Sequence, residues 1–506
     1  MVPRLPTPLL DLLWLSAAAL AWSCPEGWLA PLGWGGVIVW WLRRCFTPHA
    51  AWLLLAALTL HAATVWHWLA ATLHTYAPMP WLPAWGITLV FGGYLALFPL
   101  FSLLLLRRFG DGARALTLSG LAVVFWGLGQ FAQGWLFTGI PWMPVETAWV
   151  DWPVLAGLLP ILGGEGTTLL VLALLVLATA PGVWDRLRTV PLALGGALLL
   201  VGWGAGGWVD AQAERGEPFS VAVVQGNIAQ NEKWRPGRAD ELVKHHLDLT
   251  PVDADWSVWA ETVLPFFILD DARLLHDLEQ GIAARQTRLI LGAPVRSEET
   301  FPPGDFPPYR NGMLLFDSEG RPAGLYGKVH LVPFGEYLPM PGIFGFLNGF
   351  QMGIGAYHPS KMVDRALPLG PGRPGGLICY ESIFPELSRA WVRRGADVLV
   401  NITNDAWFGI SQAPWQHLQH ARLRAAENRR SVVRAANTGI SALIDERGVV
   451  TALLPLERQG VVQGWVSSRR DTVPSLWLAP TLEYGSALAG LIYLLAAWLR
   501  RRRSTP

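Results

Sequence analysis

The sequence predicts two structural classes in one chain: a multi-pass α-helical membrane bundle and an α/β layered domain. Of its 506 residues, 52% are hydrophobic and only 15% are charged, a balance typical of membrane insertion. The charge is unevenly spread, because residues 1–209 hold eight arginines, no lysine and seven acids. After residue 210, β-branched runs alternate with helical stretches. The net charge of +1 does not favour nucleic acid as a partner.

Apolar runs of roughly 20 residues, the length that spans a bilayer, predict eight transmembrane helices. Seven lie in a transmembrane region over 1–209, the eighth covers 481–499, and residues 500–506 form a basic tail. The first seven lie near residues 8–23, 27–42, 50–72, 82–106, 115–138, 155–181 and 190–209. Their basic loops all fall on one side, which the positive-inside rule makes the cytoplasm. Both termini are then cytoplasmic, and the domain over 210–480 lies on the outer face.

The polar region reads as strands and helices in alternation, which predicts sheets covered by helices. Expected strands are 220–228, 255–262, 288–295, 311–317, 376–381 and 397–405, and expected helices are 239–249, 272–286 and 416–433. Sites in such domains collect at the carboxyl ends of strands. The expected strands end in Glu261, Cys379 and Asn404–Asp405.

Cys379 is one of three cysteines, too few and too irregularly spaced for a disulfide framework or a zinc ribbon. A lone buried cysteine is usually a small core residue, but at a strand end it is also placed as a nucleophile. A thiol then needs a base or a nearby cation. Glu261 and Lys328, each at or near a predicted strand end, supply a proton acceptor and an oxyanion donor.

A metal site is the other chemistry weighed for this domain. His417 and His420 stand three residues apart on an expected helix, but the sequence offers no third ligand beside them. The sequence also contains no HExxH, P-loop or GxSxG motif. We therefore expect neither a metal nor a cofactor.

Four segments resemble the Glu–Lys–Cys landmarks of the nitrilase superfamily: WAET (259–262), YGKVHLVPFGEY (326–337), GLICYE (376–381) and NITNDAWFG (401–409). With seven preceding spans, one following span and VQGNIAQNEKW (224–234), nearly the whole chain resembles the bacterial apolipoprotein N-acyltransferases. The resemblance implies a nitrilase-like αββα sandwich at the periplasmic face of the inner membrane. It implies Glu261 as general base, Lys328 as stabiliser of the oxyanion and Cys379 as nucleophile. It also implies supporting roles, which fall on Trp234, Asn311, Glu336, Tyr380 and Glu381.

The activity that the resemblance implies is the last step of bacterial lipoprotein maturation. A fatty acyl chain passes from a phospholipid, through a thioester on Cys379, to the amine of a diacylglyceryl-cysteine on an apolipoprotein. The uncharged segment 337–357, rich in Gly, Phe and Met, is either an ordinary loop or a lid that dips into lipid. Two rivals stay open: a membrane-anchored amidase acting on a small amide, and a transporter. The transporter is disfavoured because the predicted spans hold almost no charge.

Overall fold

The computed structural model describes residues 7–24, 27, 29–47, 49–179, 190–296, 309–340, 342, 357–363 and 365–504. The chain divides into two compact units. One comprises Met1–Ala70, Pro80–Ala211 and Val473–Pro506, and the other Ala71–Met79 and Gln212–Thr472. The predicted boundaries were 209/210 and 480/481, so the structure groups 71–79 with the second unit and 473–480 with the first.

Apolar helices build the first unit: α1 (Thr7–Trp22), α2 (Ala30–Arg44), α3 (Ala50–Val65), α5 (Trp81–Gly110), α6 (Ala115–Trp135), α7 (Pro153–Thr179), α9 (Val190–Ala211) and α16 (Ser475–Ser504). Large apolar side chains such as Leu82, Val90 and Leu116 are more than three-quarters exposed. Helices that are apolar on their outward faces are expected in lipid, where a water-facing polar stripe has no use.

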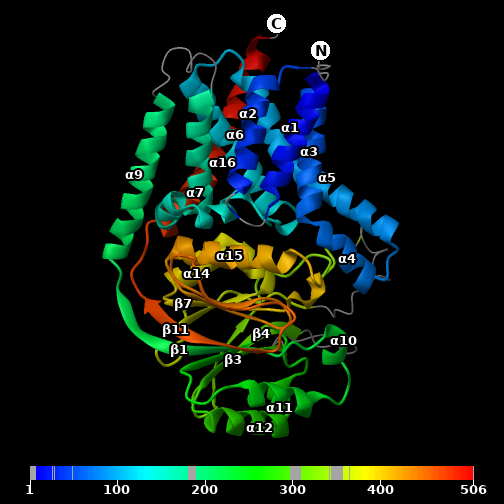
Figure 1. The fold of residues 1–506 in the computed structure, drawn as a ribbon, viewed down its shortest axis with the longest axis vertical. Helices are drawn as coiled ribbons and strands as arrows, with labels where there is room; N and C mark the ends of the chain where they lie inside the picture. The colour runs from blue at the N-terminus through cyan, green and yellow to red at the C-terminus, as the bar shows by residue number, and fades with distance from the viewer. Residues whose placement is uncertain are drawn as a thin grey trace, which may run out of the picture. The chain divides into compact units, whose positions relative to one another are not determined.

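Four helices of the described residues are long and apolar enough to cross a membrane: Trp81–Gly110, Ala115–Thr138, Pro153–Thr179 and Ser475–Arg502. The predicted span 50–72 is broken in the structure, because α3 and α4 (His67–Tyr76) meet at a bend of 51°. Counted together, this bent pair brings the number to five. The full count of eight spans stays a prediction. Helix α1 begins and α16 ends at the same end of the helical unit (Figure 1).

The second unit is a sandwich of two sheets with helices on both outer faces. The six-stranded sheet has the order β11-β1-β2-β3-β4-β5 and the five-stranded sheet β10-β9-β8-β7-β6. The strands are β1 (Arg215–Gln225), β2 (Trp256–Trp259), β3 (Arg288–Arg296), β4 (Tyr309–Phe316), β5 (Pro322–Gly327), β6 (Pro374–Ile378), β7 (Val398–Thr403), β8 (Val432–Ala436), β9 (Ser441–Ile444), β10 (Val450–Leu454) and β11 (Gly460–Arg469). Strands β1, β2 and β3 run parallel, as do β6, β7 and β8.

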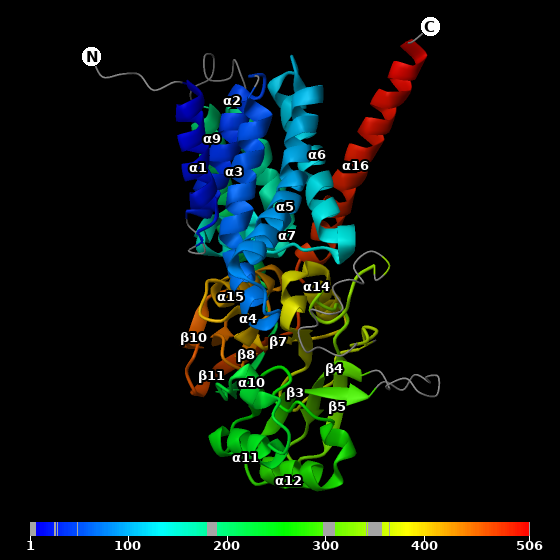
Figure 2. The ribbon, with the colours of Figure 1, turned by 90° about the vertical axis from the view of Figure 1, so that its right-hand side faces the viewer.

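Helices α11 (Ala239–Leu249) and α12 (Ala272–Ala283) cover one sheet, and α14 (Pro385–Arg393) and α15 (Ala413–Asn428) cover the other (Figures 1 and 2). Apolar side chains of α11 and α12, such as Leu242 and Leu278, pack on Val224, Trp259 and Leu291 of the first sheet. Every residue of β2, β7 and β8 is buried, as expected for strands covered on both faces. The predicted αββα sandwich is confirmed.

The structure corrects one helix and adds strands to the prediction. The stretch 416–433 was predicted as a helix throughout, but α15 ends at Asn428 because Arg429 takes a left-handed conformation with φ 48°. Residues 432–436 form strand β8 instead. Strands β5, β9, β10 and β11 were not predicted.

Candidate active site

Glu261 lies two residues after the end of strand β2 and is held at both carboxylate oxygens. The side-chain amide of Asn311 donates to Oε1 at 2.6 Å, and the backbone N–H of Asn404 donates to Oε2 at 2.9 Å. The turn comes close to strand β3, because a Cβ added at Gly292 would lie 2.6 Å from the Glu261 Cα. A glycine at 292 is therefore required for the carboxylate to take this position.

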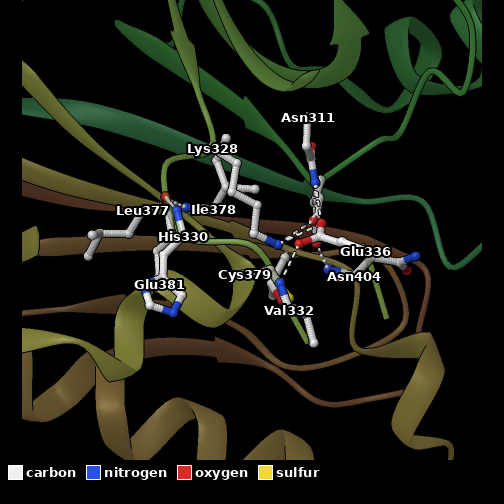
Figure 3. Close-up of polar contacts among 12 residues, drawn as sticks. Asn311, Lys328, His330, Val332, Glu336, Leu377, Ile378, Cys379, Glu381 and Asn404 are labelled. Atoms are coloured by element: carbon white, nitrogen blue, oxygen red, sulfur yellow. Dashed lines mark hydrogen bonds and ion pairs between the residues drawn. The ribbon is translucent and has the colours of Figure 1, made fainter. Parts of the chain in front are cut away.

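Lys328 follows strand β5, and its ammonium group is buried among carboxylates (Figure 3). Its Nζ donates to Glu336 Oε1 at 2.8 Å and lies 3.7 Å from Glu261 Oε1. Burial disfavours the ammonium, but Glu336 and Glu261 outweigh it and raise the pKa of Lys328 above its usual value. Lys328 is therefore a permanently charged donor at neutral pH.

Glu336 completes this ionic cluster and fixes its geometry. Besides the bond from Lys328, its Oε1 accepts from the Asn311 amide at 3.2 Å, and its Oε2 accepts from the backbone N–H of Val332 at 2.8 Å. Asn311 thus bridges Glu261 and Glu336, and the two carboxylates share the one ammonium of Lys328.

Cys379 follows strand β6 and begins the short helix η5 (Cys379–Ile383). Its backbone takes a left-handed conformation with φ 52°, which is uncommon for a residue other than glycine. Burial, followed by the charge of Glu261, raises the pKa of the thiol, while Lys328 acts in the opposite direction. The resting thiol is therefore neutral, and it needs a base at the moment it attacks.

Glu381 lies two residues after Cys379 and acts on the backbone around it. Its carboxylate accepts from the backbone N–H groups of Val329, His330 and Ile378 at 2.6, 3.1 and 2.7 Å. It also accepts from the Tyr326 hydroxyl at 2.9 Å. Burial raises the pKa of Glu381 to about 7, although the backbone donors act to lower it. Glu381 therefore ties the turn after Lys328 to the turn that carries Cys379.

The other two predicted supporting residues, Tyr380 and Trp234, differ in how deeply they are buried. Tyr380 is buried and its ring packs against His330 and Phe384, at centroid distances of 5.9 and 5.1 Å. Trp234 is 48% exposed, and among the described contacts none joins it to Glu261 or Cys379. The lid segment 337–357 lies mostly outside the described residues.

Three residues near the site were not recognised from sequence as part of it. Lys233 is 1% exposed and interacts electrostatically with Glu261. Among the described residues its Nζ has no hydrogen-bond partner. Ser382 and His417 contact Cys379 directly, His417 through Nε2, which lies 3.0 Å from the Cys379 carbonyl oxygen. The only signal for Lys233 was its place in the segment 224–234.

The metal-site alternative for His417 is not supported by its surroundings. Both ring nitrogens already face oxygen atoms of the protein, with Nδ1 at 2.9 Å from Asp405 Oδ1 and Nε2 near Cys379 and Ser382. Within the described residues there is no group of three or more His, Cys, Asp or Glu side chains placed to hold a metal ion.

Glu261, Lys328 and Cys379 lie at or near the ends of β2, β5 and β6 in the αββα sandwich, and the sequence of this unit matches a known family. The family model for carbon-nitrogen hydrolases matches residues 220–471. Among solved structures, Nit3 of Saccharomyces cerevisiae, a nitrilase-superfamily member, is 19% identical and aligns over 49% of this chain and 90% of its own, with a TM-score of 0.37.

The similarity extends through the helical unit. The family model for the N-terminal domain of apolipoprotein N-acyltransferases matches residues 13–177. The apolipoprotein N-acyltransferase of Geobacter metallireducens is 36% identical over 89% of this chain and 88% of its own length. That of Vibrio cholerae is 33% identical over 86% of each chain. This chain belongs to the apolipoprotein N-acyltransferase family.

Proposed function

We propose that this protein transfers a fatty acyl chain from a phospholipid to the amino-terminal amine of a diacylglyceryl-cysteine on an apolipoprotein. The observation that carries the proposal is that Glu261, Lys328 and Cys379 interact electrostatically with one another in a chain of this family. Figure 3 shows Lys328 and Cys379 beside Glu336. A neutral thiol, a carboxylate and a fixed ammonium are the three parts that a two-step acyl transfer needs.

In the first step Cys379 attacks the ester carbonyl of the phospholipid while Glu261 takes the thiol proton. The tetrahedral intermediate carries a negative oxygen, which the Lys328 ammonium and the backbone N–H of Tyr380 stabilise. When the intermediate collapses, the ester C–O bond breaks and Glu261 returns its proton to the departing lysophospholipid oxygen. The acyl chain then remains on the sulfur as a thioester.

In the second step the amine of the lipoprotein attacks the thioester, and Glu261 takes one of its protons. The new C–N bond forms, the C–S bond breaks, and the thiolate recovers the proton from Glu261. Lys328 needs no titration in either step, because Glu336 and Glu261 keep it charged. Glu261 alone moves protons. Asn311 holds the Glu261 carboxylate in place, and Glu336 holds the Lys328 ammonium.

The proposed location is the periplasmic side of a bacterial inner membrane, with both chain termini in the cytoplasm. The support is the distribution of arginine: Arg43 and Arg44 end α2, Arg107 and Arg108 lie in the last turn of α5, and a run of arginines ends α16. A catalytic domain on the opposite, periplasmic side would have access to phospholipid of the outer leaflet of that membrane.

The alternative proposal is an amidase that hydrolyses a small amide with the same residues. The ionic cluster serves either reaction, because water and an amine attack a thioester in the same way. The family membership, and helices long and apolar enough to cross a membrane, favour acyl transfer over hydrolysis.

Intact-mass measurement after incubation with phospholipid tests the first step. We expect a fatty-acyl increment on the wild type that neutral hydroxylamine removes, as for a thioester. Cys379→Ala should show no increment, and the matched control Cys24→Ala/Cys45→Ala should be acylated like the wild type, because those thiols lie in the helical unit. An increment that survives in Cys379→Ala, or none in the wild type, would refute the proposal.

A further inference from the structure

The carbonyl of Cys379 ends a chain of hydrogen bonds that reaches into the core of the second unit. Ser382 Oγ lies 3.1 Å from the Cys379 carbonyl oxygen and 2.9 Å from His417 Nε2. His417 Nδ1 lies 2.9 Å from Asp405 Oδ1, and the other oxygen of Asp405 accepts from Arg434 at 2.7 Å. Helix η5, helix α15, the turn after β7 and strand β8 each supply one member.

The charge of Asp405 fixes which group donates in its hydrogen bond with His417. Although burial acts to raise it, Arg434 and His417 lower the pKa of Asp405, so it is a carboxylate and accepts the Nδ1–H of His417. Burial and Arg434 lower the pKa of His417, while Asp405 and the Cys379 carbonyl act to raise it. Its Nε2 lies 3.0 Å from the Cys379 carbonyl oxygen and 2.9 Å from Ser382 Oγ. The Ser382 hydroxyl donates to the Cys379 carbonyl, and His417 Nε2 contacts both that carbonyl and Ser382 Oγ, so two side chains hold the same carbonyl.

The order Ser382–His417–Asp405 is that of a serine-nucleophile triad. Ser382 is fully buried, however, and its hydroxyl is directed onto the backbone of the neighbouring turn. The Ser382–His417–Asp405 hydrogen bonds therefore act on the backbone of Cys379.

We propose that the Ser382–His417–Asp405 chain is a positioning device that keeps the Cys379 carbonyl in place and the nucleophile in its left-handed backbone conformation. The inference rests on the proposed role of Cys379. A residue with φ 52° needs its surroundings to hold it. Glu381 fixes the N–H of the residue before Cys379, and Ser382 fixes the carbonyl of Cys379 itself, so the sulfur is presented from a turn that is anchored on both sides.

Single-turnover acylation of Cys379 by phospholipid tests this in the full-length protein. We expect Ser382→Ala to slow acylation on the order of tenfold, with little change in the phospholipid concentration that gives half the maximal rate. The matched control is Ser388→Ala, because Ser388 is as buried as Ser382 but its hydroxyl donates to Pro385. The control should acylate like the wild type even if its thermal stability falls by the same amount.

The double variant Ser382→Ala/His417→Ala separates a chain from two independent packing defects. Since Ser382 and His417 contact each other and hold the same Cys379 carbonyl, the losses of the two single variants should not multiply in the double variant. Losses that multiply, or an equal loss in Ser388→Ala, would overturn the inference. Acyl mass on Ser382 in a Cys379→Ala background would also overturn it. A wild type that is never acylated on Cys379 would instead refute the proposed function itself.

Discussion

At the scale of single residues, burial of the Lys233 ammonium has an effect on the free energy of unfolding that can be measured. The ammonium is buried, and among the described residues no hydrogen bond compensates it. Burial lowers the pKa of Lys233 to about 8, with Glu261 opposing the shift. The charged form is thus disfavoured in the fold, and the site keeps a second cation beside Glu261 at the expense of stability.

Replacing Lys233 by Met should make the protein more stable at neutral pH. In the folded state the pKa lies below that of an unfolded lysine, so the penalty is full below pH 8 and disappears as the pH rises through the unfolded value of 10.5. The shift corresponds to about 3 kcal/mol of unfolding free energy. Thermal unfolding in detergent at pH 7 and above pH 10 measures it.

Lys244→Met is the matched control, because Lys244 is an exposed lysine of helix α11 paired with Asp248. We expect it to change the unfolding temperature little at either pH. A Lys233→Met protein that is less stable at pH 7 than the wild type would contradict the assignment of an uncompensated charge.

At the scale of elements, the end of helix α4 belongs with the second unit although it follows directly on an apolar helix. The Thr72 hydroxyl donates to the Trp407 carbonyl at 2.8 Å, and the Tyr76 hydroxyl donates to the Ala406 carbonyl at 2.9 Å. The rings of Tyr76 and Trp407 pack edge to face at 4.8 Å. This segment therefore contacts the residues that follow Asp405, the carboxylate hydrogen-bonded to His417 Nδ1.

Tyr76→Phe should lower the unfolding free energy by about 1 kcal/mol, the usual net value of one hydrogen bond, because the Ala406 carbonyl keeps only the longer bond from the Gly409 N–H, at 3.3 Å. Thermal unfolding in detergent measures the loss. Tyr94→Phe, which alters a tyrosine of α5 in the first unit, is the control and should be neutral. Equal effects of the two substitutions would argue against a specific role for this contact.

The elements also show where sequence patterns stop being informative. Strands β1, β2, β3, β4, β6 and β7 were predicted because apolar and β-branched runs mark buried strands. Strand β8 was missed because Arg429, and not a glycine, ends α15, so no terminator signal preceded it. Strand β10 alternates between partly buried and exposed positions, with no continuous apolar run.

The site was predictable to the extent that it sits on strand ends. Glu261 and Cys379 follow β2 and β6, which were predicted. Lys328 follows β5, which was not, and it was found through its landmark segment YGKVHLVPFGEY. The partners of Cys379 were not predictable, because the contact between His417 and Cys379 joins residues 38 positions apart on different elements. His417 was weighed as a metal ligand, since spacing along a helix says nothing of what faces it across the core.

At the scale of the whole molecule, the chain joins an apolar helical unit to a sandwich whose fixed cation, carboxylate and thiol suit a covalent intermediate. A hydrolase and a transferase differ in what removes the acyl group from Cys379. Transfer requires that the thioester outlast contact with water and yield to an amine.

A single-turnover chase of the isolated acyl-enzyme tests this central claim most directly. The acyl-enzyme, formed with labelled phospholipid, is mixed with a diacylglyceryl-cysteine peptide that has a free amine, or with the same peptide N-acetylated. We predict that the label moves to the free amine and stays on Cys379 with the blocked peptide. Release of the label as free fatty acid at the same rate with both peptides would contradict the account.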